Sequence, residues 1–138
     1  MVTTQTIRIE TRGFTDVVDI TDEVERAIVE SGIRDGIVTV FIPGSTAGVT
    51  TLEYEPGAIQ DLKDLIDRWI PADKRYRHDA RWGDGNGFSH IRAACIGPSL
   101  TVPFRNRLLL LGTWQQIIMV DFDNRPRQRE VVLQIVGE

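Results

Sequence analysis

Cysteine and histidine are both scarce in this chain of 138 residues. Cys95 is the only cysteine, so no disulfide forms within the chain, and we expect a reducing, cytoplasmic location. No run of about 18 apolar residues occurs, which excludes a membrane-spanning helix, and the N-terminal residues lack the basic start and apolar block of a signal peptide. The net charge of −4 argues against a general nucleic-acid binder, because such proteins are usually basic.

The overall composition is that of an ordinary globular protein. Apolar residues make up 41% and charged residues 26%, and the length suits one domain with one core, spanning residues 1–138. Residues 3–11 alternate between polar and apolar side chains, which predicts a strand with one wet face. Residues 36–42 are almost continuously apolar, which predicts a central strand covered on both faces.

Helices are expected in two places. Apolar residues recur every three or four positions after Asp19 and again over residues 58–70. Asp19 or Thr21 offers a cap for the first of these helices. Further strands are expected at residues 45–54, 99–104, 107–111, 115–123 and 127–136. Strands outnumber helices and cluster at the end of the chain. The pattern therefore predicts an α+β fold, a mainly antiparallel β-sandwich with two helices.

One glycine-rich stretch, residues 76–90, contains both histidines, His78 and His90. Gly83, Gly85 and Gly87 remove any local preference for helix or strand, so we expect a long irregular loop. Compact domains rarely keep such a loop unless it has a function, which predicts a small-molecule or metal site here. Residues 91–96, which follow, fit a helical turn or a strand equally well.

The two histidines point to metal binding or proton transfer. Imidazole does both near neutral pH, and two histidines with one carboxylate form a common open metal set. Glu53 is the first candidate carboxylate because it follows a strand, and Asp79 and Asp84 are the alternates. An equally good reading makes both histidines structural, since no tight spacing of ligands is present.

Arginines and small hydroxyl residues offer places for an anion. Arg75, Arg77, Arg81 and Arg92 flank the histidines, and guanidinium groups pair well with phosphate. Ser45 and Thr46 lie in a small-residue turn that presents backbone N–H groups to an anion or serves only close packing. The turn lacks the lysine of a P-loop.

Several motifs together resemble the YjbQ-like family, whose members are often described as secondary thiamine-phosphate synthases. The resemblance covers nearly the whole chain. It rests on residues 43–47 (Pro-Gly-Ser-Thr-Ala) with Glu53, residues 76–78 (Tyr-Arg-His), 89–90 (Ser-His), 97–103 (Gly-Pro-Ser-Leu-Thr-Val-Pro), 111–115 (Leu-Gly-Thr-Trp-Gln) and 135–138 (Ile-Val-Gly-Glu).

This resemblance implies a small α+β sandwich that assembles as a homotrimer. It implies a site near a subunit interface with His78, His90 and Glu53, which act in catalysis or hold zinc or another divalent metal. The implied reaction joins a pyrimidine diphosphate to a thiazole phosphate and releases pyrophosphate. The residues that we assign to binding of the phosphorylated substrate are Arg77, Arg81, Arg92, Asn86, Ser45 and Thr46.

Two positions depart from the family pattern. Gly44 stands where many members have a histidine, and Phe88 replaces the first histidine of a Gly-His-Ser-His sequence. The chain therefore has fewer imidazoles than its relatives. An alternative function is a non-catalytic homotrimer that binds a metal or a small anion.

Overall fold

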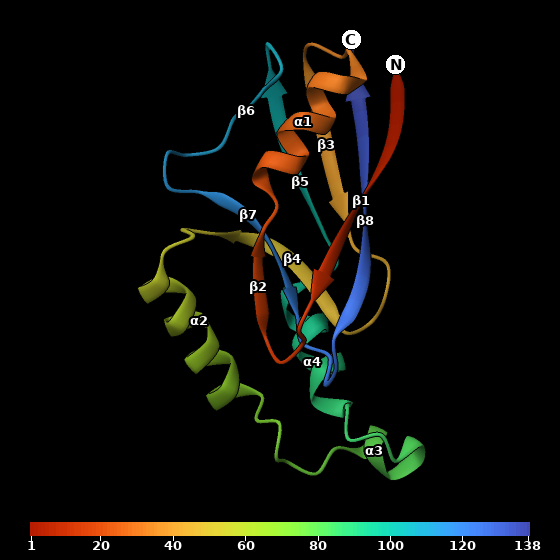
Figure 1. Cartoon of the computed structure of the whole chain (residues 1–138), viewed down its shortest axis with the longest axis vertical. Coiled ribbons are helices and arrows are strands. Elements are labelled where there is room, and N and C mark those ends of the chain that lie inside the picture. The colour runs from red at the N-terminus through yellow and green to blue at the C-terminus, as the bar shows by residue number, and fades with distance from the viewer.

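The computed structural model describes all 138 residues as two antiparallel sheets with four helices (Figure 1). The larger sheet has the strand order β1-β8-β3-β5-β6 and the smaller one β2-β7-β4. The larger sheet consists of β1 (Val2–Thr11), β8 (Arg127–Gly137), β3 (Gly36–Phe41), β5 (Ser99–Arg105) and β6 (Leu108–Leu109). The smaller sheet consists of β2 (Asp16–Asp19), β7 (Gln116–Asp121) and β4 (Ala47–Leu52). The α+β class and its antiparallel sheets are thus confirmed.

β3 lies at the centre of the larger sheet, between β8 and β5. Its side chains alternate: Val38 and Val40 are buried in the core, whereas Ile37 and Phe41 are 44% and 40% exposed on the opposite face. The prediction of cover on both faces is therefore wrong. One face of this sheet packs on the rest of the molecule, and the other remains open with apolar side chains on it.

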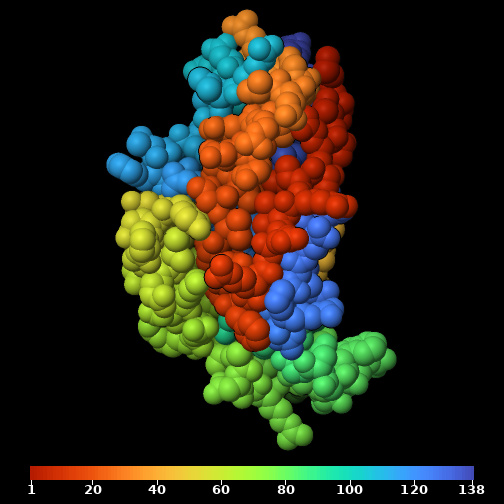
Figure 2. Space-filling model, viewed as in Figure 1, coloured from red at the N-terminus to blue at the C-terminus, as the bar shows by residue number.

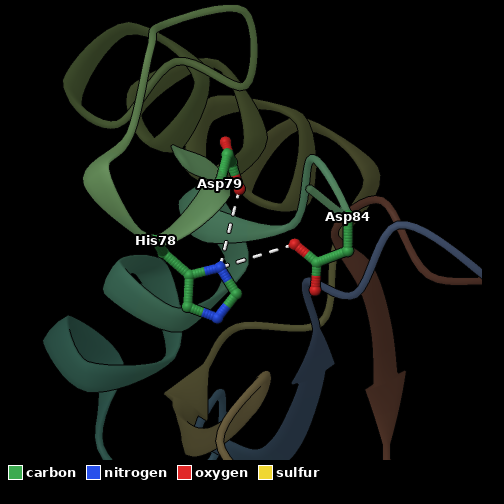
Figure 3. A group of neighbouring side chains, drawn as sticks. All are labelled: His78, Asp79 and Asp84. Atoms are coloured by element: carbon green, nitrogen blue, oxygen red, sulfur yellow. Dashed lines mark ion pairs between the residues drawn. The ribbon is translucent and has the colours of Figure 1, made fainter. Parts of the chain in front are cut away.

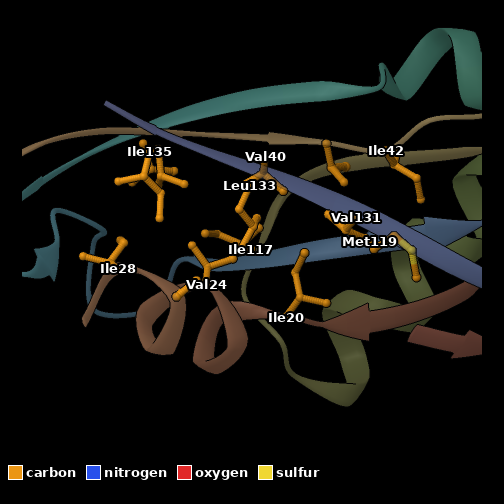
Figure 4. Packing of buried hydrophobic residues seen from close by; sticks show 14 of the residues in the cluster. Ile20, Val24, Ile28, Val40, Ile42, Ile117, Met119, Val131, Leu133 and Ile135 are labelled. Carbon is orange, nitrogen blue, oxygen red and sulfur yellow. The ribbon is translucent and has the colours of Figure 1, made fainter. Parts of the chain in front are cut away.

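The strand that is covered on both faces is β7, in the smaller sheet. Ile117 and Met119 point into the main core, which is shared with the larger sheet and with helix α1 (Thr21–Ser31), as Figure 4 shows. Ile118 and Val120 point the other way, into a second core under two further helices. The alternating side chains of one strand therefore join two cores, and the smaller sheet forms the middle layer.

Helix α1 begins where expected. The Asp19 carboxylate accepts a hydrogen bond from the backbone N–H of Thr21 at 3.0 Å, and Gly32 ends the helix in a left-handed conformation. Helix α2 (Pro56–Trp69) begins at Glu55, whose carboxylate accepts from the N–H groups of Gly57 and Ala58. These bonds to the charged form lower the pKa of Glu55.

The glycine-rich stretch is largely helical, which corrects the expected irregular loop and raises the number of helices from two to four. Helix α3 (Arg77–Trp82) ends at Gly83, which adopts a left-handed conformation, and α4 (Gly87–Ile96) begins directly after Asn86. A side chain at Gly87 would place its Cβ 2.6 Å from Cβ of Tyr76. The glycines thus end one helix and allow close packing of the next.

Two other boundaries differ from the expectation. The strand β2 occupies residues before the first helix where no strand was expected, and it follows a turn in which Phe14 and Thr15 both have positive φ. The strand expected at residues 107–111 shortens to Leu108–Leu109. None of the four helices is long and apolar enough to cross a membrane.

Candidate functional site

Helices α3 and α4 bring the two histidines together at one end of the molecule. The ring centroids of His78 on α3 and His90 on α4 are 4.3 Å apart, and the ring planes are inclined by 37°. In Figure 2 the green segment that includes α3 projects from the lower end of the molecule. The sequence spacing of the two residues carried no information about this contact, because a loop of unknown shape separates them.

Two aspartates approach the same ring nitrogen of His78, Asp79 from α3 itself and Asp84 from the short linker between α3 and α4 (Figure 3). Nδ1 of His78 lies 3.5 Å from Oδ1 of Asp79 and 3.4 Å from Oδ1 of Asp84. This nitrogen is buried and has no hydrogen-bond partner in the chain. A buried polar atom without a partner is costly, so this nitrogen is a candidate ligand atom.

The three side chains fit a divalent cation. Their donor atoms all lie within 4.8 Å of one another. Ligand atoms about 2.1 Å from a tetrahedral zinc ion are themselves about 3.4 Å apart, close to the two separations seen here. Imidazole nitrogen and carboxylate oxygen are both usual zinc ligands, so the donor types agree as well.

Backbone N–H groups hold both carboxylates in place. Oδ1 of Asp79 accepts from the N–H of Gly87 at 2.8 Å, and Oδ1 of Asp84 accepts from the N–H of Asn86 at 3.2 Å. A carboxylate oxygen has a second lone pair, so each can still bind a cation. Outer hydrogen bonds of this kind orient metal ligands in known sites.

A pocket of about 540 Å³ opens beside the histidines. Lys74, Arg75 and Arg77 are exposed at this pocket. It is lined by Lys74, Arg75, Tyr76, Arg77, His78, Gly87, His90 and Ile91, a set without any carboxylate. Three cationic side chains and two imidazoles suit an anionic ligand such as phosphate. Lys74 was not among the expected residues, although the basic run at residues 74–77 was visible in the sequence.

The hydroxyl of Tyr76 anchors the segment that carries these basic residues. It donates a hydrogen bond to the carbonyl of Pro71 at 2.7 Å. Burial raises the pKa of Tyr76, and the nearby carboxylates of Asp73 and Asp79 add to this, against the lowering effect of Arg92. The residue therefore keeps its proton and acts as a donor.

Glu53 does not join the histidines within one chain. It lines a separate pocket of about 560 Å³ together with three other acidic residues and two aromatic ones. The acidic residues are Asp19, Asp22, Glu53 and Glu55, and the aromatic residues are Tyr54 and Trp114. In Figure 1 the connection from β4 to α2, which carries Glu53, lies away from α3. The alternates Asp79 and Asp84 occupy the place expected for Glu53.

Arg92 and Arg81 make contacts within the chain. The Arg92 side chain is 3% exposed, and its guanidinium donates to the carbonyl of Ile70 at 2.9 Å and to Thr15 Oγ1 at 3.0 Å. It also lies over the ring of Phe88. The guanidinium of Arg81, by contrast, lies 5.4 Å from the centre of the Trp82 ring on the exposed surface. Of the four arginines expected around the histidines, Arg75 and Arg77 line the histidine pocket.

The remaining expected residues lie near a buried ionic network that sequence reasoning missed. Ser45 is exposed, whereas Thr46 is 5% exposed, donates to Oδ2 of Asp123 and accepts from Arg129. Burial raises the pKa of Asp123, but hydrogen bonds from Thr46 and Arg127 outweigh this and lower the pKa overall. The network joins Asp121, Asp123, Arg127 and Arg129. The sequence did contain a signal for this network: aspartates at alternate positions, Asp121 and Asp123, are followed across a short turn by arginines at alternate positions, Arg127 and Arg129.

The fold and the site define a small α+β protein of two sheets with a histidine pocket at one end. A family model described as "UPF0047 protein YjbQ-like" matches residues 5–138. This chain belongs to that family, as the resemblance in its motifs implied.

Relatives of known sequence and structure agree with this placement. A UPF0047 protein of Archaeoglobus fulgidus is 38% identical over 127 residues, covering 92% of this chain and 96% of its own. A solved structure of a YbjQ-like protein of unknown function from Sulfolobus solfataricus matches with a TM-score of 0.94 and 32% identity, covering 100% of this chain and 99% of the other. A protein of the same family from Clostridium acetobutylicum has a TM-score of 0.88 and 35% identity, covering 96% of this chain and 99% of its own.

Proposed function

We propose that His78, Asp79 and Asp84 bind a divalent cation, with zinc as the expected ion, and that the adjoining histidine pocket binds a small phosphorylated molecule. The observation that carries this proposal is the buried, unpartnered Nδ1 of His78, which faces oxygens of Asp79 and Asp84. These three residues would hold the ion. A cation held there supplies Lewis-acid stabilisation of charge on a phosphate oxygen.

The chain's own basic residues suit the substrate. Lys74, Arg75 and Arg77 line the same pocket as His78 and carry positive charge for phosphate groups. His90 also lines it, and its side chain makes no hydrogen bond within the chain, so the imidazole is available for proton transfer to or from a bound substrate. The reaction that we propose is the one implied by the family resemblance, joining a pyrimidine diphosphate to a thiazole phosphate with release of pyrophosphate.

We further propose that the chain forms a homotrimer in which Glu53 of one subunit faces the histidines of the next. The acidic pocket around Glu53 and the basic rim at residues 74–77 have opposite charge, which favours contact between different surfaces of two copies. Head-to-tail contacts of this kind form a ring when the rotation between successive subunits closes, which for three subunits is a third of a full turn. The exposed Ile37 and Phe41 on the open face of the larger sheet offer apolar area for the same assembly.

The proposal includes a cytoplasmic location. Cys95 is exposed and free, as thiols are in a reducing compartment.

A non-catalytic metal- or anion-binding homotrimer is the second candidate, and Phe88 favours it. Phe88 is 3% exposed and packs under the guanidinium of Arg92, so this position contributes packing where relatives have an imidazole. Phe88→His separates the two candidates. A strong rise in turnover identifies a weakened enzyme, whereas altered zinc affinity without turnover identifies a binding protein.

The anion site is tested by titrating inorganic phosphate and pyrophosphate into zinc-loaded protein. Arg77→Ala should weaken binding about tenfold or more, because a charge-assisted contact is worth about 1.5–3 kcal/mol. Arg105→Ala is the matched control, since Arg105 is an exposed arginine on β5 outside the pocket. Equal losses of phosphate affinity in the two variants would show that binding depends only on the net charge of the protein and not on the pocket.

A further inference from the structure

The four-residue linker that carries Asp84 has little conformational preference of its own. Gly83 and Gly85 both have positive φ, of 67° and 64°, and no atom lies within 4 Å of a Cβ built on either. Glycine visits many conformations in such a linker. The position of Asp84 beside His78 therefore depends on contacts with the rest of the fold.

Those contacts come from a turn at the far end of the sequence. Nδ2 of Asn124 donates a hydrogen bond to the carbonyl of Asp84 at 2.9 Å, and the backbone N–H of Asn124 donates to Oδ1 of Asn86 at 3.1 Å. Asn86 is 6% exposed, and its own N–H donates to the Asp84 carboxylate. One asparagine thus holds both ends of the short segment from Asp84 to Asn86.

The turn that carries Asn124 is itself fixed. The preceding residue, Asp123, is fully buried, and its carboxylate accepts from Thr46 and Arg127. Its carbonyl accepts from the N–H of Phe14 at 2.8 Å, and its N–H donates to Asp121. The buried ionic network therefore supports the turn from several strands, and Asn124 extends from a rigid base.

We infer that Asn124 is a positioning residue, which holds the Asp84 carboxylate in place for the cation. This inference rests on the proposed cation site. Residues that orient metal ligands without touching the ion contribute about 10- to 100-fold in affinity. Without the bond from Asn124 Nδ2, the linker must be ordered when the ion binds, and that cost appears as weaker binding.

The test is the dissociation constant for Zn²⁺ alone, measured on the full chain by competition with a chromogenic chelator. Asn124→Ala should weaken binding about tenfold. The control is Asn106→Gly. Asn106 is also a turn asparagine, with φ 52°, and its amide oxygen accepts from Arg34. It lies in the turn from β5 to β6, which is at the opposite end of the molecule from α3 in Figure 1. This variant should bind Zn²⁺ as the wild type does.

A double-mutant cycle distinguishes positioning from a general loss of structure. If Asn124 acts through Asp84, adding Asn124→Ala to Asp84→Asn should change the Zn²⁺ affinity less than twofold. A full additional tenfold loss would overturn the inference, as would wild-type affinity in the single variant Asn124→Ala. If the wild type itself binds no Zn²⁺, the cation site and the inference both fall. If Asp84→Asn weakens binding and Asn124→Ala does not, the inference alone falls.

Discussion

Arg92 and Arg77 both flank the histidines, yet the structure predicts that replacing Arg92 lowers the stability of the fold and that replacing Arg77 leaves it almost unchanged. Arg92 is buried and donates to Ile70 and Thr15, whereas Arg77 is exposed at the histidine pocket. Arg92→Met removes the guanidinium while keeping most of the aliphatic stem. The carbonyl of Ile70 and the hydroxyl of Thr15 then lose a charged donor.

The expected loss follows from these contacts. Each of the two buried bonds is charge-assisted and worth about 1.5–3 kcal/mol. The third contact, to Asp67, involves a carboxylate that is 68% exposed, and such pairs contribute at most about 1 kcal/mol. Arg92→Met should therefore lower the free energy of unfolding by about 3–6 kcal/mol, a large part of the 5–15 kcal/mol typical of a domain.

Urea unfolding followed by tryptophan fluorescence and circular dichroism measures this loss. Arg77→Met is the matched control, and its free energy of unfolding should stay within about 0.5 kcal/mol of the wild type, because exposed substitutions rarely cost more. If Arg92→Met does not fold, Arg92→Lys takes its place in the measurement. It keeps the positive charge and should show a smaller loss of unfolding free energy. An Arg92→Met midpoint equal to that of the wild type would refute the scaffold role of Arg92.

Two further predictions concern acid stability and packing. Because the pKa of Asp123 is lowered in the folded state, the unfolded chain binds more protons as pH falls below about 4, so this stabilisation is lost as pH falls through the folded pKa. Asp123→Asn should flatten the pH dependence of urea midpoints below about pH 4, and an unchanged slope would contradict the assignment. Gly36→Ala should lower the free energy of unfolding by about 1–3 kcal/mol or more, because the added Cβ would lie 2.1 Å from the carbonyl oxygen of Val136. A thermal midpoint equal to that of the wild type would show that β3 and β8 move apart at this position without a loss of stability.

The strands were the most predictable part of the fold, because alternation along β1 and β8 follows directly from one buried face. The cover of β3 and β7 was not predictable in the same way. Cover on both faces was predicted for residues 36–42 alone, whereas only the layer order decides that β7 is buried on both faces while β3 keeps an open one.

The glycine-rich stretch shows a different limit of sequence reasoning. Its glycines were read as breakers of regular structure, whereas Gly83 ends a helix and Gly87 allows close contact with Tyr76. The location of the candidate site was nevertheless predictable, since both histidines lie in this stretch. The choice between Glu53 and the two aspartates needed the three-dimensional contact, because sequence separation does not report distance through space.

Zinc content measured by elemental analysis tests the central claim most directly. Untagged protein loaded with zinc and freed of excess metal should hold about one zinc per chain, as expected for a single site. His78→Ala should lose this zinc, whereas His90→Ala and Asp64→Asn, an exposed carboxylate on α2, should keep it. Wild-type protein without zinc, or His78→Ala with a full complement, would contradict the account.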